Sequence, residues 1–489
     1  MTHFRVSLAV AIVTVTAVIP LAHGDGDNGR AFKAKNESGE ARTINVAGFP
    51  VVAPDNPFFL DLGTNGRRCV TCHQPAENMS VSAASVAKRF EATSGQDPIF
   101  RLNDGANSPL ADVSTREQRR QAYSMLRTKG VIRVGLPVPE NAEFILAAVA
   151  DPYGYAGNND NGNELSLFRR PLPTTNIAFL STVMWDGRET LQKGSAAAID
   201  FNLAHLSNSA TETHAQGPTP LDQATRELIV AYQRGLFTAQ VSDAGAGDLR
   251  QDGATGGPEE LAKRLFVFGE NDPLGCDAAG AHCTGSNPLF NPIVFTDYDA
   301  WARLEGSGRN RTRRAIARGQ ELFNTLPIPI KGVAGINDDF NVAAVLGTCT
   351  TCHDTPHAGN HSVPAPLNIG VADPAVSPAD GGDGIHNRFG LPVGDMPVYT
   401  LCKINTACDL LGVTKKVVTD PGRALITGRW QDVGRFKGPI LRGLSGRAPY
   451  FHNGAAATLA DVVRFYDARF ELGLGEQQKA DLVAFLRAL

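Results

Sequence analysis

Two copies of one short pattern constrain this chain more than any other feature. The letters CVTCH occupy residues 69–73, and CTTCH occupies residues 349–353. Each copy sets two thiols three residues apart and places a histidine directly after them. The chain has only 8 cysteines and 11 histidines among 489 residues, so two matches are not expected by chance and indicate two built sites.

The spacing suits covalent attachment of haem. Two thiols on a turn that enters a helix can form thioether bonds to the two vinyl groups of one porphyrin, and the adjacent histidine then reaches the iron. Zinc would need four ligands in a closed shell, and neither pattern is followed by a second Cys or His pair at zinc-finger spacing. A thioredoxin-like dithiol would not need the histidine and would lie in a βαβ pattern, which the sequence lacks. We therefore predict two covalently attached c-type haems, one held by Cys69, Cys72 and His73 and the other by Cys349, Cys352 and His353.

The first residues are typical of a secretory signal peptide. Arg5 precedes an uninterrupted apolar run over residues 6–18, and the small residues Ala22 and Gly24 stand where a signal peptidase could cut. A retained membrane anchor is the alternative, but the run is short for a spanning helix. We predict removal of residues 1–24, a periplasmic mature protein and no membrane span after cleavage.

Export determines how the other four cysteines are interpreted, because free thiols seldom persist in an oxidising compartment. Cys276 with Cys283, and Cys402 with Cys408, would each close a short loop. Both pairs are therefore predicted to form disulfides. A metal site made by Cys276, His282 and Cys283 is the alternative for the first pair.

Length and charge limit the domain organisation and the partners. A net charge of -4 and a pI near 6.3 give no reason to expect nucleic acid or an anionic membrane surface as partner. The chain is long enough for two or three domains with cores. A basic, glycine-containing stretch near residues 305–312 predicts the boundary between a haem domain at 25–305 and a second at 306–489. Phe59 and Phe323 precede the two motifs and are candidates to pack under the haems.

Two helices are expected near the C-terminus. Thr458 can cap a helix together with Asp461, and that helix then carries Tyr466 inward on one apolar face with Leu459, Val462 and Val463. Residues 475–489 repeat apolar side chains at helical spacing, which predicts a helix that closes the second domain.

Two longer segments resemble the bacterial di-haem cytochrome c peroxidase and MauG superfamily. They are RRPLPTTNIAFLSTVMWDGRETL in the first half and FKGPILRGLSGRAPYFHNGAAATLADVVRFYD in the second. The resemblance implies a mainly α fold of two cytochrome-c-like haem domains that face each other. We expect few strands, long loops and a first domain enlarged over roughly residues 195–305. In that superfamily one haem meets peroxide while the other stores or relays electrons.

The resemblance also assigns residues between the two haems. Trp185, in the letters WDGR, matches the tryptophan that relays electrons or shares a hole between them. Asn176 matches the asparagine that helps to hold a calcium ion between the domains. Arg447 and Pro449 stand where the superfamily supplies two backbone carbonyls to that ion. A carbonyl ligand is indifferent to its side chain, so one calcium ion is expected here.

The sixth ligand of the second haem has two candidates. The peroxidases place a methionine where this chain has Tyr466, and the MauG branch resembles the chain in carrying tyrosine there. Met396, in the loop GDMPVYTL, is the alternative. A phenolate is a hard, anionic donor that favours ferric and higher oxidation states, whereas a thioether raises the potential. With Tyr466 bound, the second haem would store oxidising equivalents well.

The first haem is expected to be open. The peroxidases commonly cap this resting iron with a histidine soon after the motif, but no histidine occurs from Gln74 to Leu203. Met79 is an alternative cap and is more often a core residue.

Peroxide cleavage needs a group that moves a proton between the two oxygens. A count without gaps from the letters WDGR arrives at His205, whereas a longer loop brings His214 or Glu212 to the site. We favour His214, because helix-compatible sequence follows its segment.

These residues predict a periplasmic di-haem peroxidase that reacts with hydrogen peroxide at the first haem and shares oxidising equivalents through Trp185 with the second. The donor would be a small cytochrome or copper protein, or a side chain of a protein substrate. One alternative is a dioxygenase that resembles the di-haem rubber oxygenases. Another is an electron-transfer cytochrome without catalysis, which would need both irons six-coordinate.

Overall fold

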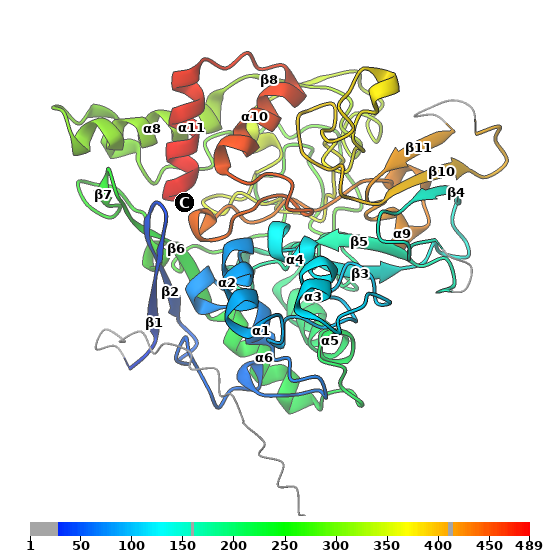
Figure 1. The fold of residues 1–489 in the computed structure, drawn as a ribbon. Coiled ribbons are helices and arrows are strands. Elements are labelled where there is room, and N and C mark those ends of the chain that lie inside the picture. The colour runs from blue at the N-terminus through cyan, green and yellow to red at the C-terminus, as the bar shows by residue number, and fades with distance from the viewer. Residues whose placement is uncertain (1–27, 158–160, 409–413) are drawn as a thin grey trace, which may run out of the picture.

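The computed structural model describes residues 28–157, 161–408 and 414–489 (Figure 1). The predicted signal peptide at 1–24 lies outside these residues. Among the described helices, none combines the length and the apolar character that a membrane span requires.

Short helices and short strands alternate along the chain. The described helices are α1 Cys69–Cys72, α2 Ala83–Thr93, α3 Arg116–Ala122, α4 Ser124–Lys129, α5 Ala196–His214, α6 Gln223–Arg234, α7 Pro258–Leu261, α8 Arg309–Thr325, α9 Ala424–Thr427, α10 Leu459–Phe470 and α11 Glu476–Ala488. The described strands are β1 Ala31–Asn36, β2 Gly39–Asn45, β3 Ile132–Leu136, β4 Phe144–Ala150, β5 Leu165–Arg169, β6 Leu236–Asp243, β7 Gly247–Asp248, β8 Ile328–Ile330, β9 Val345–Gly347, β10 Val398–Lys403 and β11 Lys415–Val418.

The expectation of few strands is wrong. The described strands form four antiparallel sheets, of which the largest has the order β1-β2-β6-β7. Strand β6 is buried along most of its length, and Thr43 of β2 lies opposite Thr238 of β6 with their hydroxyls 2.8 Å apart. These partners are far apart in the sequence, so no local sequence pattern predicts the sheet.

A second sheet joins the two halves of the chain. Strand β10 pairs with β11 on one edge and with β4 on the other, in the order β11-β10-β4. In Figure 1 this sheet lies at one side, beside the separate pair β3 and β5. A strand from residues 25–305 is therefore hydrogen-bonded to a strand from residues 306–489, and the division into two domains stays a prediction.

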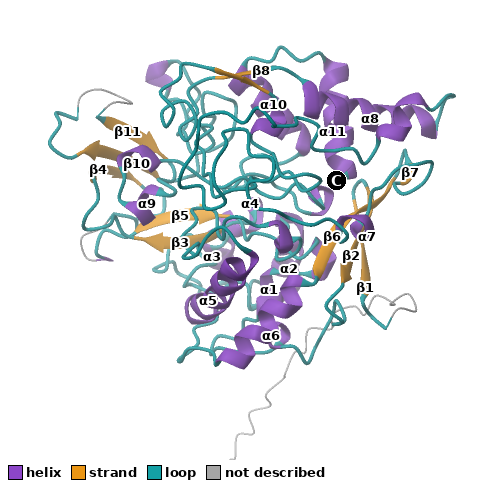
Figure 2. Ribbon diagram, turned by 180° about the vertical axis from the view of Figure 1, so that it is seen from behind, coloured by secondary structure: helices purple, strands orange, loops and turns teal. Residues whose placement is uncertain are grey.

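The helices gather in two groups separated by loops. In Figure 1, α8, α10 and α11 lie in the upper part and α1, α2, α5 and α6 in the lower part. Figure 2 shows long loops running through the middle of the molecule between them, as expected.

The two predicted C-terminal helices are present. Thr458 caps α10: its Oγ1 accepts the Asp461 amide at 3.2 Å, and an Asp461 carboxylate oxygen accepts the Thr458 amide at 2.8 Å. Helix α11 packs closely on α8 at Gly319, where a Cβ would lie 2.0 Å from the carbonyl oxygen of Asp481. Only glycine allows this approach, which brings Phe323 of α8 and Phe485 of α11 into one core.

Candidate functional site

Both cysteine motifs begin with the same local structure. The hydroxyl of Thr71 accepts the amide of Arg68 at 2.9 Å, and the hydroxyl of Thr351 accepts the amide of Thr348 at 2.9 Å. A threonine one residue before the second cysteine thus closes each turn. In both motifs the cysteines are free thiols.

The first motif opens into a large cavity. Cys69, Cys72 and His73 lie on the wall of a space that is mostly apolar and partly open to solvent; we call it the N-terminal cavity. The His73 Nδ1 atom lies 3.3 Å from the carbonyl oxygen of Met79, which fixes the ring and leaves Nε2 for a metal. Burial lowers the pKa of His73 to about 4, so the imidazole is neutral, as a metal ligand must be.

The second motif repeats this arrangement. Cys349, Cys352 and His353 line a second, mostly apolar space, the C-terminal cavity. The His353 Nδ1 atom lies 2.6 Å from the carbonyl oxygen of Gly359, and burial lowers the pKa of His353 to about 4.

An aromatic ring packs beside each motif histidine. The ring of Phe323 is centred 5.8 Å from that of His353, as predicted. In the first motif the prediction is wrong by one residue: Phe58, not Phe59, lines the cavity and lies 6.1 Å from the ring of His73. Phe59 packs behind it against Tyr232.

These residues fit a thioether-bound porphyrin and do not fit a redox dithiol. Burial raises the pKa of Cys69, Cys349 and Cys352 to about 12, which is opposite to the lowered pKa that activates a redox thiol. The C-terminal cavity also carries the Nε2 atom of His452, which is buried and lacks a hydrogen-bond partner among the described residues. A cofactor with polar groups at its edge would satisfy that atom.

Trp185 lies on the wall between the two cavities. It is 9% exposed and lines both spaces, together with Lys437 and Pro439. Its Nε1 atom donates to the carbonyl oxygen of Arg170 at 2.8 Å, and its ring packs edge-on against His452 with 6.3 Å between the centroids. The indole is therefore held between the two cavities, and its role between two haems stays a prediction.

Of the two candidate ligands of the second iron, only Tyr466 lines the C-terminal cavity. It shares that wall with Leu459, Val462 and Val463 of the same helix, as the spacing predicted. No hydrogen bond reaches its hydroxyl within the described part of the chain, and burial raises the pKa of the phenol. Met396 is instead buried in a core cluster with Phe465.

The helix α5 brings His214 into the N-terminal cavity and turns His205 away from it. Leu203, Ser207, Thr211 and His214 line the space from one face. His205 does not: its side chain is half exposed, and its Nδ1 atom lies 2.7 Å from a carboxylate oxygen of Glu189.

Glu212 and Met79 also lie off this wall. Glu212 is exposed on α5, and neither residue lines the N-terminal cavity. Met79 serves the site through its carbonyl oxygen, while its side chain is buried in the core.

A buried carboxylate that the sequence analysis missed holds His214. Asp104 pairs with His214 Nδ1 and with the guanidinium of Arg67, and all three residues line the N-terminal cavity. Burial acts to raise the pKa of Asp104, but Arg67 and His214 hold it below the ordinary value. Asp104 stands 110 residues before His214, so no sequence spacing could have found the pair.

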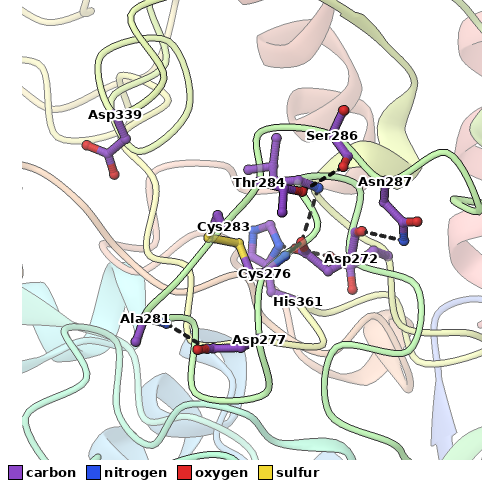
Figure 3. Close-up of a disulfide and its surroundings, with 12 residues drawn as sticks. Asp272, Cys276, Asp277, Ala281, Cys283, Thr284, Ser286, Asn287, Asp339 and His361 are labelled. Atoms are coloured by element: carbon purple, nitrogen blue, oxygen red, sulfur yellow. Dashed lines mark hydrogen bonds and ion pairs between the residues drawn. A yellow bond between two sulfur atoms is a disulfide. The ribbon is translucent and has the colours of Figure 1, made fainter.

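Both predicted disulfides are present. Cys276 is bonded to Cys283, and Cys402 to Cys408. Figure 3 shows the first pair in a loop where Asp272 accepts the Cys276 amide at 2.7 Å. A metal site at Cys276, His282 and Cys283 is not supported, because both thiols are consumed and no group of three candidate ligands is found among the described residues.

The predicted calcium residues do not fit a calcium ion. Both amide atoms of Asn176 bond to the backbone of Thr238, at 2.8 and 2.9 Å. The carbonyl oxygen of Arg447, expected as a ligand, accepts a hydrogen bond from Nη2 of Arg170 at 2.7 Å. The carbonyl oxygen of Pro449 accepts no hydrogen bond from the described residues. A protein cation already binds the Arg447 oxygen that calcium would need.

The charges at this place also disfavour a metal ion. The guanidinium of Arg170 donates further to the carbonyls of Val81 and Gly130, and that of Arg447 is buried against carbonyls of its own segment. Burial and the neighbouring Arg447 lower the pKa of Arg170 to about 10. Two buried guanidiniums repel a divalent cation, and we therefore correct the calcium prediction.

No family model matches the chain. The cytochrome-c peroxidase IdrP1 of Denitromonas iodatirespirans is 42% identical over 355 residues, which are 65% of this chain and 82% of that protein. The protein of the same name from Pseudomonas sp. (strain SCT) is 41% identical over 246 residues, 47% of this chain and 54% of that protein. A solved MauG-like protein associated with microbial copper homeostasis aligns with a TM-score of 0.28 and 17% identity over 66% of this chain and 76% of that chain, a likeness too weak to carry an argument.

Two free thiols and an anchored, neutral imidazole on one cavity wall define the site of a c-type haem protein. The identity to the curated relatives adds the lineage: the chain belongs to the di-haem cytochrome c peroxidase and MauG superfamily. It is a peroxidase, and its cofactor is haem c.

Removal of calcium should leave this protein unchanged. We expect the melting temperature of the holoprotein to be the same with and without EGTA, because Arg170 supplies the cation at the predicted site. Arg170→Gln should destabilise by about 2 kcal/mol or more, since buried carbonyls lose their donor. Arg116→Gln, which removes an exposed guanidinium, is the control and should have little effect. A melting temperature that falls in EGTA and recovers with calcium would contradict the correction.

Proposed function

We propose that this chain is a periplasmic di-haem peroxidase in which hydrogen peroxide reacts in the N-terminal cavity and electrons arrive by way of Trp185 from the C-terminal cavity. The observation that carries the proposal is one wall, with Trp185 in it, shared by two cavities that each hold a complete cysteine and histidine motif. The proposal includes two haem domains, at 25–305 and 306–489.

Bound haem would supply in each cavity an iron that exchanges single electrons, and in the N-terminal cavity one that binds peroxide. The chain supplies the orientation. Carbonyl oxygens fix the rings of His73 and His353, so that both Nε2 atoms face their cavities. The apolar walls limit the number of water molecules near the site, which strengthens electrostatic interactions inside the cavities.

His214 is the proposed proton carrier. With Nδ1 held by Asp104, its Nε2 atom would accept a proton from the inner oxygen of hydrogen peroxide and donate it to the outer oxygen. The outer oxygen could then leave as water, and bound haem would supply the two electrons that cleavage of the O–O bond consumes. This titratable pair favours a peroxidase over a dioxygenase, which needs no such transfer.

Tyr466 is the proposed sixth ligand of the second iron, because its hydroxyl lines the C-terminal cavity without a protein partner in the described residues. The donor class follows from the one-electron chemistry: a small cytochrome or copper protein, or an oxidisable side chain of a protein substrate. No observation favours one of these donors.

The first test is rapid mixing of the diferric holoprotein with one equivalent of hydrogen peroxide. We expect two haems per chain, haem bands that shift at once, and relaxation only after a reductant is added. Haem content comes from the pyridine haemochrome and protein concentration. One haem per chain, or haem bands that do not move, would overturn the proposal. An electron-transfer cytochrome without catalysis would then be the favoured function.

Replacement of Tyr466 tests the second ligand. Tyr466→Met should raise the potential of one haem and change its spectrum, because a thioether favours the reduced iron. Tyr450→Phe is a matched control: it lines the same cavity, but its hydroxyl already donates to the carbonyl oxygen of Leu444 at 3.0 Å. Met396→Leu should also have no effect. A spectrum that changes with Met396→Leu and not with Tyr466→Met would reverse the assignment.

Replacement of His214 tests the proton carrier. His214→Gln should slow the reaction with peroxide by about 10²–10⁴-fold. His205→Gln is the control, since His205 lies on the same helix outside the cavity, and it should react at the wild-type rate. Equal rates for both variants would remove His214 from the mechanism.

A further inference from the structure

Lys437 is a buried lysine in the wall that the two cavities share. It is 8% exposed, and its backbone amide donates to the carbonyl oxygen of Trp185 at 2.9 Å. The preceding residue, Phe436, exchanges two backbone hydrogen bonds with Leu367 and stacks on His452 with 3.8 Å between the ring centroids. The backbone around Lys437 is therefore held firmly, and the residue lines both cavities.

The ammonium group of Lys437 has no counter-charge among the described residues. No hydrogen bond or ion pair reaches it within residues 28–157, 161–408 and 414–489. Two arginines that line the N-terminal cavity do have carboxylate partners: Arg169 pairs with Asp186 and Asp420, and Arg188 also pairs with Asp186. Burial alone lowers the pKa of Lys437 to about 7. A buried charge without a partner is costly, so the arrangement calls for an anion from outside the chain.

The lining of the C-terminal cavity indicates where that anion would bind. Lys437 is the one lysine or arginine among its described lining residues, and no aspartate or glutamate lines it. The buried Nε2 atom of His452 is on the same wall and also lacks a partner there; the nearest carboxylate oxygen, on Asp420, is 4.0 Å away. Two residues that line this cavity thus carry a polar nitrogen with no hydrogen-bond partner among the described residues, and the remaining walls are largely apolar.

We propose that Lys437 binds a propionate carboxylate of the haem attached to Cys349 and Cys352. Haem carries two propionates, so it brings into the cavity the anion that the chain does not provide. Lys437 is then a positioning residue: it ties the edge of this haem to the backbone beside Trp185. The inference rests on the proposed function, because it requires a haem in the C-terminal cavity.

The ion pair has an electrical consequence. A propionate without its cation leaves a negative charge beside the iron, and that charge favours the ferric state over the ferrous state. Loss of the Lys437 charge should therefore lower the reduction potential of the C-terminal haem. If the side chain of Lys437 acted only through its shape, charged and neutral replacements would change the reduction potential equally.

The test is a spectroelectrochemical titration of holoprotein variants that resolves the two haems. Lys437→Gln should lower the potential of the C-terminal haem, and Lys437→Arg should restore it. Lys416→Gln is the matched control: Lys416 is also partly buried with a lowered pKa, but it donates to the carbonyl oxygen of Trp430 at 3.0 Å and lines neither cavity. An unmoved potential in Lys437→Gln, or an equal fall in Lys437→Arg or Lys416→Gln, would overturn the inference.

A second measurement is used if a variant does not fold with both haems. If Lys437→Gln accumulates without its second haem, resonance Raman spectra of the wild type and Lys437→Arg are compared in the region of propionate bending. We expect one haem to show a displaced band, because a planar guanidinium grips a carboxylate differently from an ammonium. Identical bands would overturn the inference. Two haems in the wild type with no effect of Lys437 would reject this inference alone, whereas fewer than two would reject the proposed function.

Discussion

A carbonyl oxygen six residues farther along the chain holds each motif histidine. His73 meets the carbonyl of Met79, and His353 meets that of Gly359. This one contact sets the plane of each imidazole and the direction of its free nitrogen. The aromatic rings beside the imidazoles and the cavities in front of them are arranged around the two fixed rings. Metal binding at either motif therefore depends on the orientation of these two imidazole rings.

The sequence identified what depends on local order and missed what depends on distant contacts. Both motifs, the inward face of Tyr466 and the capped helix α10 follow from spacings of a few residues, and all are present. Trp185 required a resemblance as well, because a single aromatic residue has no pattern of its own. The strands β4 and β10, and the carboxylate of Asp104 behind His214, come together only in the folded chain. Phe58 was missed by one position, because a single turn of 3-10 helix carries both rings.

The interior accommodates positive charge in three ways. Arg169 is neutralised by two carboxylates, while Arg170 is surrounded by carbonyl oxygens only. Lys437 has neither kind of partner among the described residues. The charge of Arg169 needs no further partner. The guanidinium of Arg170 occupies the place where a metal ion was predicted. The charge of Lys437 is balanced only when a ligand binds. The polypeptide therefore supplies the partners of Arg169 and Arg170 itself, whereas the partner of Lys437 would come from the cofactor.

The sheet β11-β10-β4 sets an order of events during synthesis. Strand β4 leaves the ribosome long before its partner β10, so this sheet closes only after most of the chain exists. The N-terminal cavity is also unfinished until then, because Lys437, Pro439 and Ile440 form part of its wall. Folding of the first half of the chain alone would therefore leave the wall in front of the first cysteine motif incomplete.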